Sequence, residues 1–76
     1  MADDFADTLR SNLQDPQISG VNVHNDNGSW RVSFTFTGTE KNLRRLVGPE
    51  FDILDTAPGE EMGELIVMAA PNVNEI

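Results

Sequence analysis

The sequence contains no cysteine and has only one histidine, one tryptophan and one lysine. Without cysteine the chain can form neither disulfides nor thiolate zinc sites, and cysteine usage says nothing about its redox compartment. No apolar run approaches the roughly 18 residues that a membrane span needs, and the first ten residues carry acid where a secretory signal carries base. We therefore expect a soluble, cytoplasmic protein that does not interact with membranes.

The nucleotide-binding and hydrolase motifs are missing as well. The sequence has no G-x-G-x-x-G, no G-x-x-x-x-G-K-[ST] and no G-x-S-x-G. His24 is the only imidazole, and it would need a second residue such as Asp26 beside it to act as a base or a metal ligand. We expect a solvated turn histidine, no catalytic residues and no cofactor, so the chain is not predicted to be an enzyme.

The chain is short, with 76 residues and a mass of 8.4 kDa. A chain of this size forms one domain and buries only about 60% of its unfolded surface, so its core is thin. Stability is marginal for such a monomer, and self-association or a favourable solvent are the remaining supports. We predict one domain over residues 1–71 and a loose tail over 72–76.

Acidic residues outnumber basic ones by 13 to 5, which gives a formal net charge of −8. One interpretation is adaptation to salt: in molar salt the Debye length is about 3 Å, acidic surfaces repel each other weakly, and carboxylates keep the surface hydrated. The scarcity of lysine fits this interpretation. The alternative is that the carboxylates imitate the phosphates of nucleic acid and block a basic groove on a DNA-binding protein.

The hydrophobic periodicity predicts two helices and four strands. Phe5, Leu9 and Leu13 recur at every fourth residue, which is typical of a helix, whereas large apolar residues alternate with polar ones over 30–37, which is typical of a strand. The predicted elements are a helix over 3–13, a β-hairpin with strands around 21–23 and 30–37 and a turn at 25–28, a helix over 40–47 that Gly48 and Pro49 end, and strands over 51–55 and 64–70 joined by a turn around 57–59.

This order of elements, α-β-β-α-β-β, indicates an α+β fold. The architecture that accommodates it best is a four-stranded, antiparallel-rich sheet with both helices on one face, arranged as a circular permutation of the ferredoxin-like fold. The second helix then crosses between two parallel strands. Each half consists of a helix followed by a hairpin, which leaves an internal duplication as an alternative description.

The last predicted strand carries apolar residues at every position from 65 to 70. A strand in which apolar and polar residues alternate can expose one face to water, whereas this strand is apolar on both faces. If the helices cover one side of the sheet, Leu54, Ile66 and Met68 fall on the other side, where an exposed apolar strip marks an interaction surface. We predict a protein interface there, most simply a homodimer. The alternative is a central strand that loops or the tail bury on both sides.

Charged residues gather in two kinds of cluster, one basic and one acidic. Lys41, Arg44 and Arg45 form a small basic patch that could contact nucleic acid, although a solvated helix face whose charges pair with neighbouring Asp and Glu explains them better. The acidic groups lack the alternating pattern of a calcium loop, so no metal site is predicted at Asp3, Asp4, Asp7, Glu60, Glu61 and Glu64.

The leading expectation is a small, acidic, non-enzymatic interaction or regulatory module from a salt-loving organism, acting as a dimer. The alternatives are a transcriptional regulator that contacts nucleic acid through the basic patch, and an acidic mimic that inhibits a DNA-binding protein.

Overall fold

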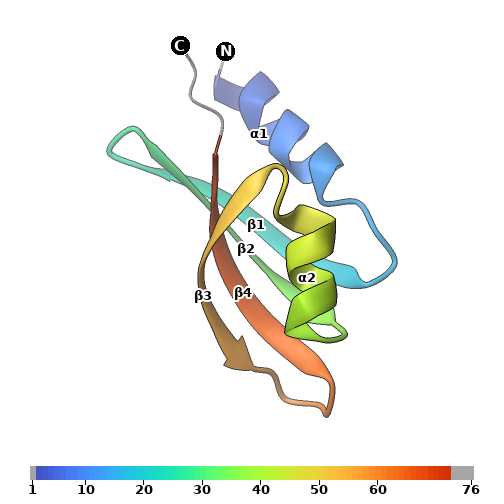
Figure 1. The fold of residues 1–76 in the computed structure, drawn as a ribbon. Helices are drawn as coiled ribbons and strands as arrows, with labels where there is room; N and C mark the ends of the chain where they lie inside the picture. The colour runs from blue at the N-terminus through green and yellow to red at the C-terminus, as the bar shows by residue number, and fades with distance from the viewer. Residues whose placement is uncertain (1, 73–76) are drawn as a thin grey trace.

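A computed structural model describes the backbone of residues 2–72 and the side chains of residues 6–72. The elements are α1 (Ala2–Asn12), β1 (Ile18–Asp26), β2 (Ser29–Thr37), α2 (Glu40–Val47), β3 (Phe51–Pro58) and β4 (Glu64–Pro71). The predicted α+β class and the order α-β-β-α-β-β are confirmed (Figure 1).

The four strands form one sheet in the order β1-β2-β4-β3, and each neighbouring pair is antiparallel. Because β4 lies between β2 and β3, those two strands run parallel, and α2 connects them. Both helices lie on the same side of the sheet (Figure 1). The permuted ferredoxin-like arrangement itself stays a prediction.

The core lies between this side of the sheet and the two helices. Alternate residues of β2 face it, and each helix contributes one apolar stripe, as the periods of a strand and a helix require. The buried residues are Leu9, Leu13, Ile18, Val32, Phe34, Phe36, Leu43, Val47, Phe51, Val67 and Ala69. No buried residue among the described side chains is polar or charged.

The first hairpin turns at Asn27 and Gly28, which have φ angles of 56° and 88°. Two residues with positive φ make the turn whose twist matches that of the flanking strands, and Asn-Gly is the preferred pair for it. The side chain of Asn25 accepts a hydrogen bond from the backbone N–H of Gly28 at 2.9 Å. The hairpin prediction is therefore confirmed.

The second helix begins as its sequence predicts. The Thr39 hydroxyl accepts a hydrogen bond from the backbone N–H of Asn42 at 3.2 Å, which satisfies one of the free donors at the helix N-terminus. At the other end α2 stops at Val47, and Gly48 is its C-cap, as predicted. Gly48 keeps a helical φ of −55° and donates its N–H to the carbonyl of Arg44.

Two strand boundaries differ from the prediction. β1 begins at Ile18 rather than near Val21, because Ile18 is buried opposite Phe36 and a bulge at Gly20, with φ of 64°, lets the strand continue. β3 continues past residue 55 to Pro58, so the connection to β4 is at 59–63 rather than 57–59. Proline is tolerated there because β3 is an edge strand.

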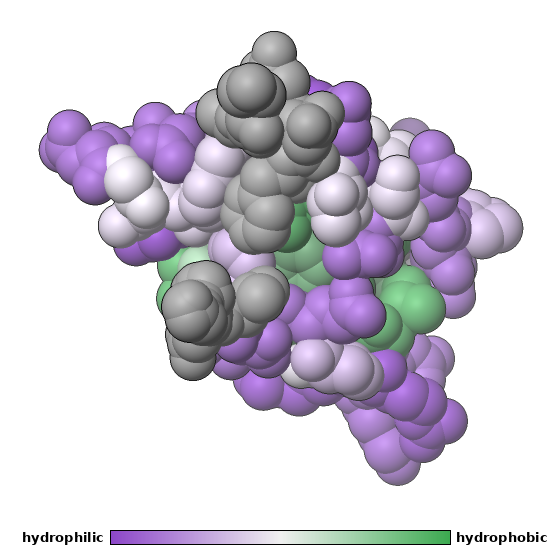
Figure 2. Space-filling model, turned by 90° about the horizontal axis from the view of Figure 1, so that it is seen from above, coloured by the Kyte–Doolittle hydropathy of each residue, from purple (hydrophilic) through white to green (hydrophobic). Residues whose placement is uncertain are grey.

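The surface is largely hydrophilic when seen from the end at which α1 lies, with apolar side chains visible only between polar ones (Figure 2). At this end Asn72 is hydrogen-bonded, since its N–H donates to the carbonyl of Glu50 at 3.1 Å. The rest of the predicted tail, 73–76, lies outside the described residues.

Candidate functional site

The strand β4 presents apolar side chains to both faces of the sheet. Val67 and Ala69 are fully buried against the helices, whereas Ile66 and Met68, which alternate with them, are 44% and 42% exposed. Neither helix lies on that side, which we call the open face (Figure 1). Ile66 and Met68 therefore form an uncovered apolar strip on an inner strand of the sheet.

Three rows of side chains cross the open face, and the middle member of each row is on β4. Each row is given from β2 through β4 to β3. The first is Thr35, Ile66 and Ala57, and the second is Ser33, Met68 and Asp55. The last is Arg31, Ala70 and Asp52. The last row continues the register of Val32 with Ala69 by one residue. The apolar strip is thus bordered by polar and cationic side chains on β2 and by acidic side chains on β3.

Leu54, the third predicted member of the interface, lies on β3 beside this strip. The register of β3 with β4 shifts between Ile53 and Asp55, so Leu54 is the extra residue of a β-bulge. Its side chain is 50% exposed. The structure places Leu54 next to Asp55, the partner of Met68 in the middle row.

Arg31 is the cationic end of its row, and its register partner on β1 is His24. Its guanidinium donates one hydrogen bond, to the carbonyl of Trp30 at 3.1 Å, and it forms no ion pair with any described residue. Since a guanidinium has five N–H donors, most of the hydrogen-bonding capacity of Arg31 is unused within the described part of the chain.

The basic patch of α2 lies on the other side of the molecule, on the helix layer. Lys41, Arg44 and Arg45 are all exposed. Arg44 forms an ion pair with Glu40, one helical turn earlier, in which Nη2 and Oε2 are 2.8 Å apart. Next to Arg45 a shallow depression of about 410 Å³ is lined by Gln17, Asn42 and Leu46. The structure therefore does not bring the patch together with the apolar strip.

His24 has no catalytic partner among the described residues. It lines an open depression of about 500 Å³ between α1 and the first hairpin, together with Asp7, Arg10 and Trp30. Within this depression Asp7 forms an ion pair with Arg10, in which Oδ1 and Nη1 are 3.6 Å apart. No hydrogen bond or ion pair joins His24 to a described carboxylate, so the partner that a general base would need is not supplied by Asp26 or any other described acid.

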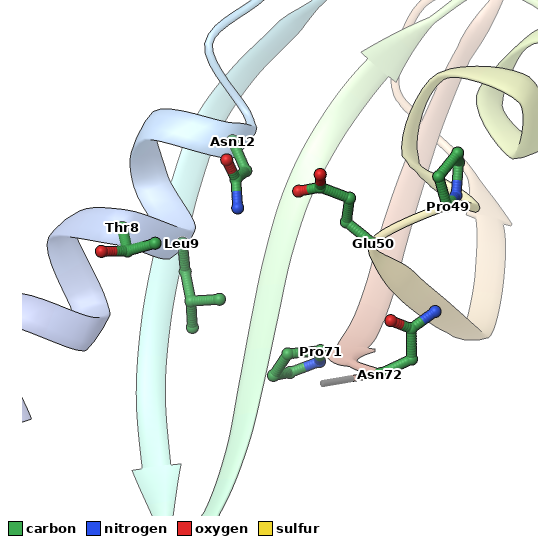
Figure 3. A pocket seen from close by; sticks show the side chains of 7 residues that line it. All are labelled: Thr8, Leu9, Asn12, Pro49, Glu50, Pro71 and Asn72. Carbon is green, nitrogen blue, oxygen red and sulfur yellow. The ribbon is translucent and has the colours of Figure 1, made fainter. Parts of the chain in front are cut away.

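A third hollow, of about 340 Å³, lies between α1 and the ends of β3 and β4. Figure 3 shows the side chains that line it, from Thr8, Leu9 and Asn12 on one side to Pro49, Glu50, Pro71 and Asn72 on the other. No sequence motif predicts this hollow, because its lining comes from separate segments of the chain.

The remaining site predictions concern metals and membranes. Within residues 6–72 no three or more His, Asp or Glu side chains are grouped so as to hold a metal ion. The side chains of Asp3 and Asp4 lie outside the described residues. Neither helix in the described part of the chain has the length and apolar character required to cross a membrane.

Comparison of the chain with known protein families, with curated proteins and with solved structures found no match.

Proposed function

We propose that the protein is a non-enzymatic interaction module that forms a homodimer through the open face of its sheet. The observation that supports this proposal is the apolar strip, Ile66 and Met68, which is more than 40% exposed on an inner strand of a sheet whose other face carries the buried core. Apolar side chains rimmed by polar ones are typical of an interaction surface.

The expected dimer is weak. Burying the exposed parts of Leu54, Ile66 and Met68 contributes about 1 kcal/mol for each side chain at about 25 cal/mol per Å², so about 6 kcal/mol for the six side chains of a dimer. A face four strands wide is also at the small end of specific interfaces. We therefore expect a dissociation constant in the micromolar to millimolar range.

The test is the effect of Met68→Asp on molecular mass, measured by sedimentation equilibrium over a range of protein concentrations. We expect the unmodified chain to approach the dimer mass and Met68→Asp to weaken the dimer by about a hundredfold or more, because a buried, unpaired carboxylate is costly. Met62→Asp is the matched control, since Met62 is fully exposed in the loop between β3 and β4. A monomer mass for the unmodified chain at every concentration would refute the interface.

We further propose that the acidity is an adaptation to high salt. The ion pairs among described side chains, Asp7 with Arg10 and Glu40 with Arg44, occupy few of the 13 acidic residues. The other described carboxylates are repelled by their neighbours in dilute buffer and hydrated in concentrated salt.

A second candidate function is nucleic-acid contact through α2. It is supported by the exposure of Lys41, Arg44 and Arg45 on one short helix. An electrophoretic mobility shift with duplex DNA tests it. Binding that Arg44→Glu combined with Arg45→Glu abolishes would support this function, and the absence of a shift with the unmodified chain would exclude it.

A further inference from the structure

The charges on the open face are distributed unequally about β4. On the β3 side of this strand are the carboxylates of Asp52 and Asp55, both exposed. On the β2 side, in the row of Asp52, is Arg31. Ala70 of β4 lies between them in this row. Asp52 and Arg31 are therefore each one strand away from β4, on opposite sides of it.

This arrangement is complementary to itself under one particular rotation. A two-fold axis along β4, with the open faces of two copies opposed, places β3 of each copy over β2 of the other and keeps the rows aligned. Asp52 then faces the partner's Arg31, and Asp55 faces the partner's Ser33. Ile66 and Met68 meet the same side chains of the second copy, so the apolar strip becomes the centre of the contact.

The other two-fold arrangement of opposed faces is less favourable. An axis across the strands places β3 over the partner's β3, which brings the acidic borders of two chains together. Each chain already carries a net charge of −8, so this contact adds repulsion between like charges. In this second arrangement, neither Asp52 nor Asp55 of the other copy faces the guanidinium of Arg31.

We propose that the second copy docks with the two-fold axis along β4, so that Asp52 of each copy forms an ion pair with the partner's Arg31. This inference rests on the homodimer proposed above and adds its orientation. Facing sheets pack about 10 Å apart with nearly aligned strands, and side chains from both sheets fill the gap. The planar guanidinium, with its unused donors, suits a carboxylate that approaches across this gap.

The test is a charge-swap cycle of Arg31→Asp, Asp52→Arg and the variant that carries both, with dimer dissociation constants measured by sedimentation. The buffer is the lowest KCl concentration at which far-UV circular dichroism shows the full fold. Each single reversal should raise the dissociation constant by about tenfold or more, because two-fold symmetry repeats the new like-charge contact twice. The swap should return the constant to within about threefold of the unmodified value.

Matched controls separate this contact from the effect of net charge. Arg45→Asp and Glu60→Arg change the net charge by the same amounts at exposed positions away from the open face, and they should leave the constant almost unchanged. If a reversal disturbs the fold, Arg31→Gln and Asp52→Asn take its place, with a smaller weakening expected from each.

The outcomes distinguish the two proposals. Weakening by each single change and recovery in the swap supports the orientation. A dimer that Met68→Asp dissociates, but whose charge variants show additive effects without recovery, overturns the orientation and leaves the homodimer standing. A chain that is monomeric throughout overturns both.

Discussion

The two faces of β4 both carry apolar side chains, but one face is buried in the core and the other is exposed to solvent. Val67 and Ala69 have no exposed surface, whereas Ile66 and Met68 keep more than two fifths of theirs. The difference arises from the helices, which lie on one side of the sheet only (Figure 1). Among residues 2–72, no further helix or strand lies over the other face of the sheet.

Apolar character alone therefore does not decide whether a side chain of β4 is buried. Alternating polar residues make β2 suited to one wet face, since Ser33 and Thr35 point to the open face while Phe34 and Phe36 fill the core. β4 has no such alternation. Its open side therefore keeps apolar surface that a second protein surface would bury.

The largest expected effect is a difference between neighbouring residues of β4. Val67→Asp places an unpaired charge in the core and should cost about 4 kcal/mol or more, which is comparable with the whole stability of a small domain. Ile66→Asp should leave the monomer folded and weaken only the dimer. Far-UV circular dichroism and thermal unfolding of both variants check this, and equal loss of structure in the two would contradict a difference between the faces.

Salt is expected to have the next largest effect. Because no buried residue among the described side chains is charged, the described carboxylates all face solvent, and salt acts on the surface rather than on the core. Lowering KCl from molar concentration should reduce the far-UV circular dichroism signal as repulsion increases. A fold that persists without salt would argue instead for a basic partner, and so for the imitation of nucleic acid.

The smallest effect concerns the helix layer. Thr39→Ala removes the hydroxyl that caps α2 and should lower the free energy of unfolding by about 1 kcal/mol. It should leave the dimer dissociation constant unchanged, because α2 lies on the covered face. Urea unfolding and sedimentation of the same sample measure the two quantities. A change in dimerisation equal to that of Met68→Asp would contradict the assignment of the interface to the open face.

The sequence predicted the elements well where local signals agreed. The alternation of β2 and the Asn27–Gly28 pair both indicate a hairpin, and Thr39 lies at the expected distance before the apolar stripe of α2. The start of β1 was missed because Ser19 and Gly20 resemble a break in a strand. Whether a glycine ends a strand or forms a bulge depends on the partner strand, which for Ile18 is β2.

The arrangement of the candidate site was only partly predictable. Alternation along β4 suffices to place Ile66 and Met68 on one face. The rows that join Met68 to Asp55 and Ala70 to Asp52 depend on strand order and on the bulge at Leu54, which are properties of the folded sheet. The same register places Arg31 on the opposite side of β4 from Asp52 and Asp55. No local pattern in the sequence around Arg31 predicts this position.

The most direct measurement of the interface is an isotope-filtered nuclear Overhauser experiment on a mixture of labelled and unlabelled chains. Signals between copies report only contacts that cross the interface. We expect them from the methyl groups of Ile66 and Met68, and none from the buried methyl groups of Leu43 and Val47 of the helix layer. A dimer whose signals between copies arise from the helix layer, or a chain that shows no such signals at millimolar concentration, would contradict the account.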